Sequence, residues 1–106
     1  MDIAKLKETI QRRISLELND DFAQEECWNI ERDILVNDIP GAIDFLKTCS
    51  EEEFYWLSEV FDEVIDQTQS QELYQVMWDR NESLENQEYK ESNLTELNFA
   101  KNALNP

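Results

Sequence analysis

Glycine and proline, the residues that most often interrupt helices, occur only once and twice among the 106 residues of this chain. The chain also lacks the Asn-Gly and Asp-Gly pairs that mark tight β-hairpins, and residues with high helix propensity dominate its composition. Apolar residues recur at helical spacing along much of its length. The sequence therefore predicts an all-α fold, a compact bundle of about five to six helices, with residues 1–106 in a single domain.

Three helices are expected in the first half of the chain. The first spans about Asp2 to Leu18, although its last apolar residues alternate and also fit a short strand. The second spans about Phe22 to Val36, and the third begins after Asp38 with a proline in its first turn. The residues predicted to face the core in the first two helices are Ile3, Leu6, Ile10, Ile14, Ala23, Cys27, Ile30 and Ile34, with Trp28 and Leu35 at the edge of the second face.

Three more helices are expected in the second half. Ser50 and the glutamate three residues later form a capping box, which predicts a helix that continues to Gln67. Another helix begins at Ser70. A last one runs from Ser92 or Asn93 to Leu104, and the polar residues 81–92 are either a helical extension or a loop.

The predicted helix 50–67 has two faces of very different character. Nine carboxylates and no Lys or Arg lie between Thr48 and Asp79, and several of them share one helix face with two aromatic rings, opposite the apolar stripe. We predict this face to be a partner-binding surface. Its residues are Tyr55, Trp56, Glu59, Asp62, Glu63 and Asp66.

Repulsion among these carboxylates is the reason for suspecting a function. Like charges three and four residues apart cost about 0.2 to 0.5 kcal/mol per pair, so folding alone would not select such a stripe. Trp56 lies among the charges, and large aromatic residues anchor many protein interfaces. The alternative is a solvated charged face of an acidic protein, with Tyr55 and Trp56 at the edge of the core.

Composition limits the function. The chain carries 25 Asp and Glu against 9 Lys and Arg, a formal charge of −16, which argues against direct binding to nucleic acid or an anionic membrane and favours a basic protein partner. No apolar run is long enough for a transmembrane helix and no secretory leader is recognisable, so we expect a cytoplasmic protein. Cys27 and Cys49 lack metal or redox spacing and are expected to be buried free thiols.

The absence of histidine removes the commonest general base and the usual zinc ligand. We therefore predict a protein that is not an enzyme, with no catalytic residues, cofactor or metal. An enzyme with a metal ion bound by carboxylates is a third reading, after the two binding functions given below.

Three features follow one another between Phe45 and Arg80. They are a cysteine before an acidic turn, the aromatic residues of CSEEEFYWLSEVF, and a TQS break before the next helix. This segment, about a third of the chain, resembles the central part of small immunity proteins from bacterial polymorphic toxin and contact-dependent growth inhibition systems. The resemblance implies a cytoplasmic protein that binds and neutralises a cognate toxin domain, commonly a nuclease, of which a tRNA-cleaving RNase is one kind.

Charge leads toward the same class of function. Nucleases are basic where they hold phosphates, so an acidic face with aromatic anchors can occupy such a groove in place of nucleic acid. The other reading is an acidic adaptor or nucleic-acid mimic that inhibits some other DNA- or RNA-binding protein. Both readings place the interface on the six residues from Tyr55 to Asp66.

Overall fold

Helices account for nearly the whole chain. The computed structural model describes residues 1–106 and contains no strand, so the prediction of an all-α fold is confirmed. If α4, η1 and α5 are counted as one interrupted segment, the chain has six helical segments, within the predicted number. The elements are α1 (Ile3–Ser15), α2 (Asp21–Val36), α3 (Ile39–Thr48), α4 (Glu51–Leu57), the 3₁₀ turn η1 (Ser58–Val60), α5 (Phe61–Thr68), α6 (Gln71–Glu82) and α7 (Gln87–Ala103).

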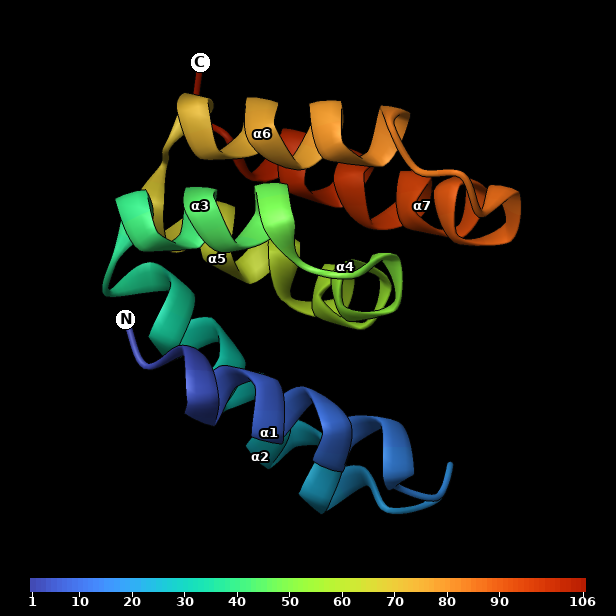
Figure 1. The fold of residues 1–106 in the computed structure, drawn as a ribbon. Helices are drawn as coiled ribbons and strands as arrows, with labels where there is room; N and C mark the ends of the chain where they lie inside the picture. Colours follow the sequence, from blue (N-terminus) through green and yellow to red (C-terminus); the bar gives the residue numbers. More distant parts are fainter.

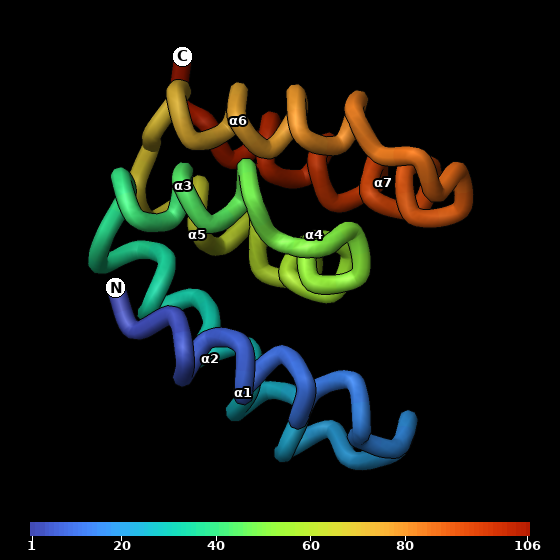
Figure 2. The backbone as a smooth tube through the Cα atoms, viewed as in Figure 1, coloured from blue at the N-terminus to red at the C-terminus, as the bar shows by residue number.

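The helices form pairs that stack on one another (Figure 1). The α1–α2 hairpin lies at one end of the molecule, the α6–α7 hairpin at the other, and α3, α4 and α5 lie between them. In this view α1, α3 and α6 are in front, whereas α2, α5 and α7 are behind them. The smooth tube in Figure 2 shows both termini on the same side of this stack. The rear face is continuous, because α5 packs against both α2 and α7.

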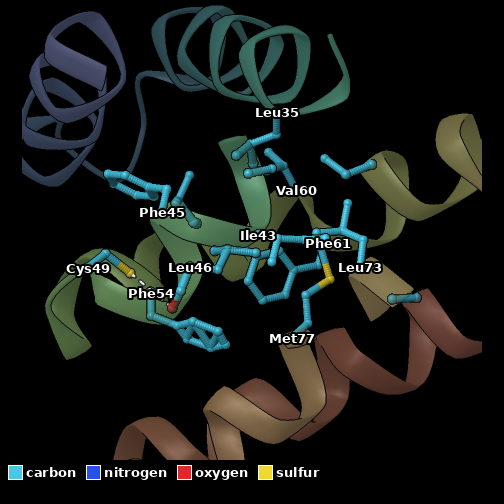
Figure 3. Packing of buried hydrophobic residues seen from close by; sticks show 14 of the residues in the cluster. Leu35, Ile43, Phe45, Leu46, Cys49, Phe54, Val60, Phe61, Leu73 and Met77 are labelled. Atoms are coloured by element: carbon cyan, nitrogen blue, oxygen red, sulfur yellow. Dashed lines mark hydrogen bonds between the residues drawn. The ribbon is translucent and has the colours of Figure 1, made fainter. Parts of the chain in front are cut away.

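One hydrophobic cluster joins all the helices. It contains 19 buried residues, with Leu6 of α1 and Ala100 of α7 near its two ends in sequence. At its centre the rings of Phe54 and Phe61 lie 5.2 Å apart and tilted, and Figure 3 shows them among residues of α2, α3 and α6. The two cysteines are free and buried, as predicted.

Local signals placed the starts of α3, α4 and α6 correctly. The side chain of Asp38 accepts a hydrogen bond from the Gly41 amide at the start of α3, and that of Ser70 accepts one from the Leu73 amide at the start of α6. The capping box at α4 is also confirmed, because Ser50 Oγ accepts from the Glu53 amide while the Glu53 carboxylate accepts from the Ser50 amide.

This capping box gives a modest stability prediction. Replacing Ser50 with alanine leaves the Glu53 amide without its side-chain acceptor, so we expect the free energy of unfolding to fall by about 1 kcal/mol. Urea denaturation measures the change. Ser92→Ala is a suitable control, since Ser92 is exposed within α7 and caps no helix; equal losses in the two variants would contradict the assignment.

The predicted continuous helix 50–67 is wrong. The chain tightens into the 3₁₀ turn η1, where the hydroxyl of Ser58 donates to the Tyr55 carbonyl at 2.6 Å and Val60 leaves the helical conformation with φ −108° and ψ 2°. In a uniform α-helix Val60 would lie beside the buried stripe, whereas the turn buries it to 1% exposure. The predicted partner-binding surface is therefore divided among α4, η1 and α5 and does not lie on one straight helix.

The start predicted for the last helix is also wrong. Helix α7 begins at Gln87, capped by Asn86, so residues 81–92 form the end of α6, a short turn and the first turns of α7. The polar pattern there conceals a buried contact, in which the Asn93 amide donates to Asn81 Oδ1 at 3.0 Å. The side-chain amide of Asn81 in turn donates to the Lys90 carbonyl at 3.1 Å, so these bonds join α6 to the first turns of α7.

The strand considered near Leu18 is absent. Helix α1 continues to Ser15, and Leu18 follows in the turn before α2 with 94% of its surface exposed. A side chain so exposed has no neighbouring strand or core to pack against. Leu18 is therefore a surface residue at the corner of the α1–α2 hairpin.

Arg80 of α6 bonds within the protein. Its guanidinium donates to the Leu46 carbonyl at 3.1 Å and to the Cys49 carbonyl at 2.8 Å. These carbonyls belong to the end of α3, where the last turn leaves acceptors unpaired. Arg80 thus ties α6 to the C-terminal end of α3.

The turn between α5 and α6 depends on one side chain. Gln69 has a left-handed backbone, φ 53°, although it is not glycine. Its side-chain amide donates to the Ala103 carbonyl at 2.8 Å, and its Oε1 accepts from the Asn105 amide at 2.8 Å. Gln69 therefore holds the last residues of α7 against this turn.

Candidate functional site

The six residues predicted to bind a partner divide between two hollows. Tyr55, Trp56 and Glu59 line one hollow of about 150 Å³. Asp62, Glu63 and Asp66 line another of about 380 Å³. Residues of α7 form the opposite wall of both hollows, since Ser92 and Glu96 line the first and Phe99, Asn102 and Ala103 line the second.

The aromatic residues of the first hollow are not exposed anchors. Tyr55 stacks on Tyr89 of α7, with ring centroids 4.3 Å apart, and meets Trp56 edge-on at 5.4 Å. Trp56 is only partly exposed and packs against the hydrophobic cluster. Both rings lie on the side of α4 opposite its buried residues, but Tyr89 of α7 covers Tyr55 and a residue of α1 covers Trp56.

Arg13 explains the position of Trp56. This residue of α1 is 8% exposed, and its guanidinium carbon lies 4.9 Å from the centre of the Trp56 ring and 5.6 Å from that of Trp28. It also pairs with the Glu59 carboxylate at 2.8 Å. The basic N-terminal helix thus neutralises part of the acidic segment within the same molecule, and Glu59 is committed to this internal contact.

Glu31 lies close to the same cluster and is completely buried. Neither of its carboxylate oxygens has a hydrogen-bond partner, and Arg13 Nε, Trp28 Nε1 and Glu59 Oε1 are also buried without one. Burial raises the pKa of Glu31 to about 8, and the nearby charge of Glu59 adds to this effect, while Arg13 opposes it. Glu31 is therefore largely protonated at neutral pH.

The buried face of α2 was predicted only in part, with Cys27 and Leu35 placed correctly. Gln24, Cys27, Glu31 and Leu35 are its buried residues, whereas Ala23, Ile30 and Ile34 are only partly buried. The helix is rotated so that a carboxylate faces inward near Arg13. Counting apolar residues alone cannot find this register, because the wheel treats glutamate as a solvent-facing residue.

The second hollow is acidic and open. Glu63 pairs with Arg32 of α2 at 3.0 Å, but Asp62 and Asp66 make no ion pair within the chain. Phe99 lies beside them with 55% of its surface exposed. Exposed carboxylates next to an exposed ring suit a Lys or Arg side chain from another molecule, because the ring face and the carboxylates both attract a cation.

Sequence reasoning missed Phe99, although a signal was present. Phe99 lies two residues after Leu97 and therefore on the opposite side of α7 from the stripe formed by Leu97, Ala100 and Leu104. A wheel drawn for this helix would have shown a large ring facing solvent. The exposed aromatic residue expected at Trp56 is thus found on α7.

Glu96, which lines the first hollow, is a further carboxylate near the predicted surface. Burial raises the pKa of Glu96, and the charges of Asp62 and Glu59 raise it further.

No three Asp, Glu, Cys or His side chains converge in a way that could hold a metal ion. None of the helices combines the length and the apolar character needed to cross a bilayer.

Comparison with protein-family models, with curated proteins and with solved structures found no match to this chain.

Proposed function

We propose that this chain is an immunity protein that binds a basic toxin domain, such as a nuclease, in the cytoplasm and blocks it without catalysing a reaction. The observation that carries the proposal is the second hollow, where two unpaired carboxylates and the exposed ring of Phe99 lie together. The resemblance of residues 45–80 to immunity proteins supplies the class of partner. The formal charge of −16 supports a partner of opposite charge.

The mechanism follows from complementary charge. A basic groove that holds phosphates presents Lys and Arg side chains, and Asp62 and Asp66 can take the place of those phosphates. Long-range attraction accelerates the encounter, toward about 10⁸ to 10⁹ M⁻¹s⁻¹ at low salt. The Phe99 ring then adds a contact that persists once water is excluded, which slows dissociation.

The best test reverses charge where it does not disturb the fold. Glu59 and Glu63 are paired with Arg13 and Arg32, so lysine at either position would remove an internal ion pair. Asp62→Lys combined with Asp66→Lys avoids this problem. We expect the affinity for the toxin domain encoded immediately upstream to fall about a hundredfold or more, because close interfacial charge pairs couple by several kcal/mol.

A matched variant separates local recognition from total charge. Glu82→Lys combined with Glu91→Lys makes the same change in net charge at exposed residues that line neither hollow. Calorimetric titration of wild type and both variants at low and high salt is the measurement. Equal losses in the two variants, or an affinity that does not change with ionic strength, would contradict charge mimicry at this site, and absence of any complex would contradict the immunity function.

A further inference from the structure

A second exposed phenylalanine lies at the other end of the same face. Phe22, in the first turn of α2, is 79% exposed and lines a hollow of about 230 Å³ with Glu25, Glu26 and Asn29. Leu18, just before this helix, is 94% exposed. Glu26 pairs with Arg12 at the surface, whereas Glu25 makes no ion pair. Here too an exposed ring lies beside an unpaired carboxylate.

Arg32 connects this hollow to the one around Phe99. Its guanidinium donates to Asn29 Oδ1 and to Glu63 Oε2, each at 3.0 Å. Asn29 lines the hollow at Phe22, and Glu63 lines the hollow at Phe99. Since α5 packs against both α2 and α7, and Arg32 contacts a lining residue of each hollow, the two hollows are neighbours on one surface that runs over these helices.

The chain shows inside its own fold what such a combination binds. Arg13 lies against two aromatic rings and pairs with a carboxylate, so ring and carboxylate together hold a guanidinium. The hollows at Phe22 and Phe99 also offer a ring and carboxylates. Arg12 and Arg32 each pair with one carboxylate there, but Glu25 in the first hollow and Asp62 and Asp66 in the second make no internal ion pair. Both therefore suit a cationic side chain whose apolar stem covers the ring.

We propose that these two hollows, joined through Arg32, form one recognition surface for a basic amphipathic segment of the partner, such as a helix with Lys or Arg beside apolar residues. This inference rests on the proposed function and extends it, because it adds Phe22 and Leu18 as a second anchor on a different helix pair. It also gives Arg32 a role. In the free protein Arg32 forms an ion pair with Glu63, and it therefore competes with the partner's cations for that carboxylate.

The competition makes an unusual prediction. Replacing Arg32 with glutamine removes a positive charge from the surface and frees Glu63, so a basic partner should bind more tightly, by about twofold to fivefold if the contact is worth what exposed ion pairs usually are. A residue with only a structural role would weaken binding when it is replaced. Replacing Phe22 with alanine removes an anchor, and we expect a loss of about tenfold.

The probe is a defined peptide, an amphipathic helix with lysines on one face and leucines on the other, compared with oligolysine. Titration of the ¹⁵N-labelled full chain should shift amides near Phe22, Arg32 and Phe99 together. Phe22→Ala should weaken the amphipathic peptide by a larger factor than it weakens oligolysine, because only the amphipathic peptide also places leucine on the ring. Ile3→Ala, which removes an exposed apolar residue of α1 outside both hollows, should affect neither.

The proposal is overturned if the shifted amides lie elsewhere, if Phe22→Ala behaves like Ile3→Ala, or if Arg32→Gln weakens binding while circular dichroism shows an intact helical fold. These outcomes are separate from those of the toxin experiment. If toxin affinity depends on Asp62 and Asp66 while peptide affinity does not change in Phe22→Ala, the proposed function is supported and the second anchor is contradicted.

Discussion

A Glu31→Gln variant is expected to be about as stable as the wild type at pH 5 and about 3 kcal/mol more stable at pH 7.5. The reason is the difference between the pKa of Glu31 in the unfolded chain, near 4.5, and its pKa of about 8 in the folded protein. Between these values the unfolded state releases a proton that the native state keeps. Stability therefore falls as pH rises, by up to about 1.4 kcal/mol per pH unit.

Urea denaturation at several pH values measures this effect. Below pH 4.5 the Glu31 carboxyl group is protonated in both the folded and the unfolded state. Its stabilising contribution to the free energy of unfolding is fully present there and is lost as pH rises through the pKa of the folded protein. Glu25→Gln is the matched control, because Glu25 lies on the same helix, undergoes the same chemical change and is exposed. If the stability of Glu31→Gln relative to Glu25→Gln is the same at pH 5 and pH 7.5, Glu31 is ionised in the folded protein.

Replacing Arg13 with methionine should destabilise the protein by about 3 kcal/mol, because removing one partner of a buried ion pair leaves the other charge uncompensated. The substitution also removes the cation from between the two tryptophan rings. Methionine keeps much of the length and apolar volume, so the loss reports on the charge and its contacts rather than on a cavity.

The neighbouring residue provides the control. Arg12 pairs with Glu26 at the same distance of 2.8 Å, but both side chains are nearly half exposed, and pairs screened by water in this way contribute little to stability. Chemical denaturation of Arg12→Met and Arg13→Met therefore compares two ion pairs of equal length and unequal burial. Similar losses in the two variants would show that the cluster around Arg13 contributes no more than a surface contact.

Much of this fold could be predicted from local rules. Scarcity of glycine and proline indicates helices, and a side-chain acceptor in the residue before a helix, such as Asp38 or Ser50, marks where it begins. These signals depend on residues only a few positions apart. The caps were therefore predicted correctly while the packing was still unknown.

The candidate site required tertiary information. The η1 turn forms because Val60 gains burial in the assembled core, and the inward position of Glu31 depends on Arg13 and on the packing of α1 against α2. Wheels treat each helix as straight and independent, so they cannot find either feature. Asp62, Glu63 and Asp66 were correctly expected to lie together, but their aromatic neighbour, Phe99, comes from a helix nearly forty residues later in the chain.

Gln69 bears on how this protein could be redesigned. Surveys of backbone conformation favour glycine at a left-handed position after a helix, because other residues pay about 1 kcal/mol or more for that geometry. A design guided by such statistics would replace Gln69 and relieve the backbone. It would also remove the two hydrogen bonds that hold Ala103 and Asn105, each worth about 1 kcal/mol, so the gain would be offset and the end of the chain released.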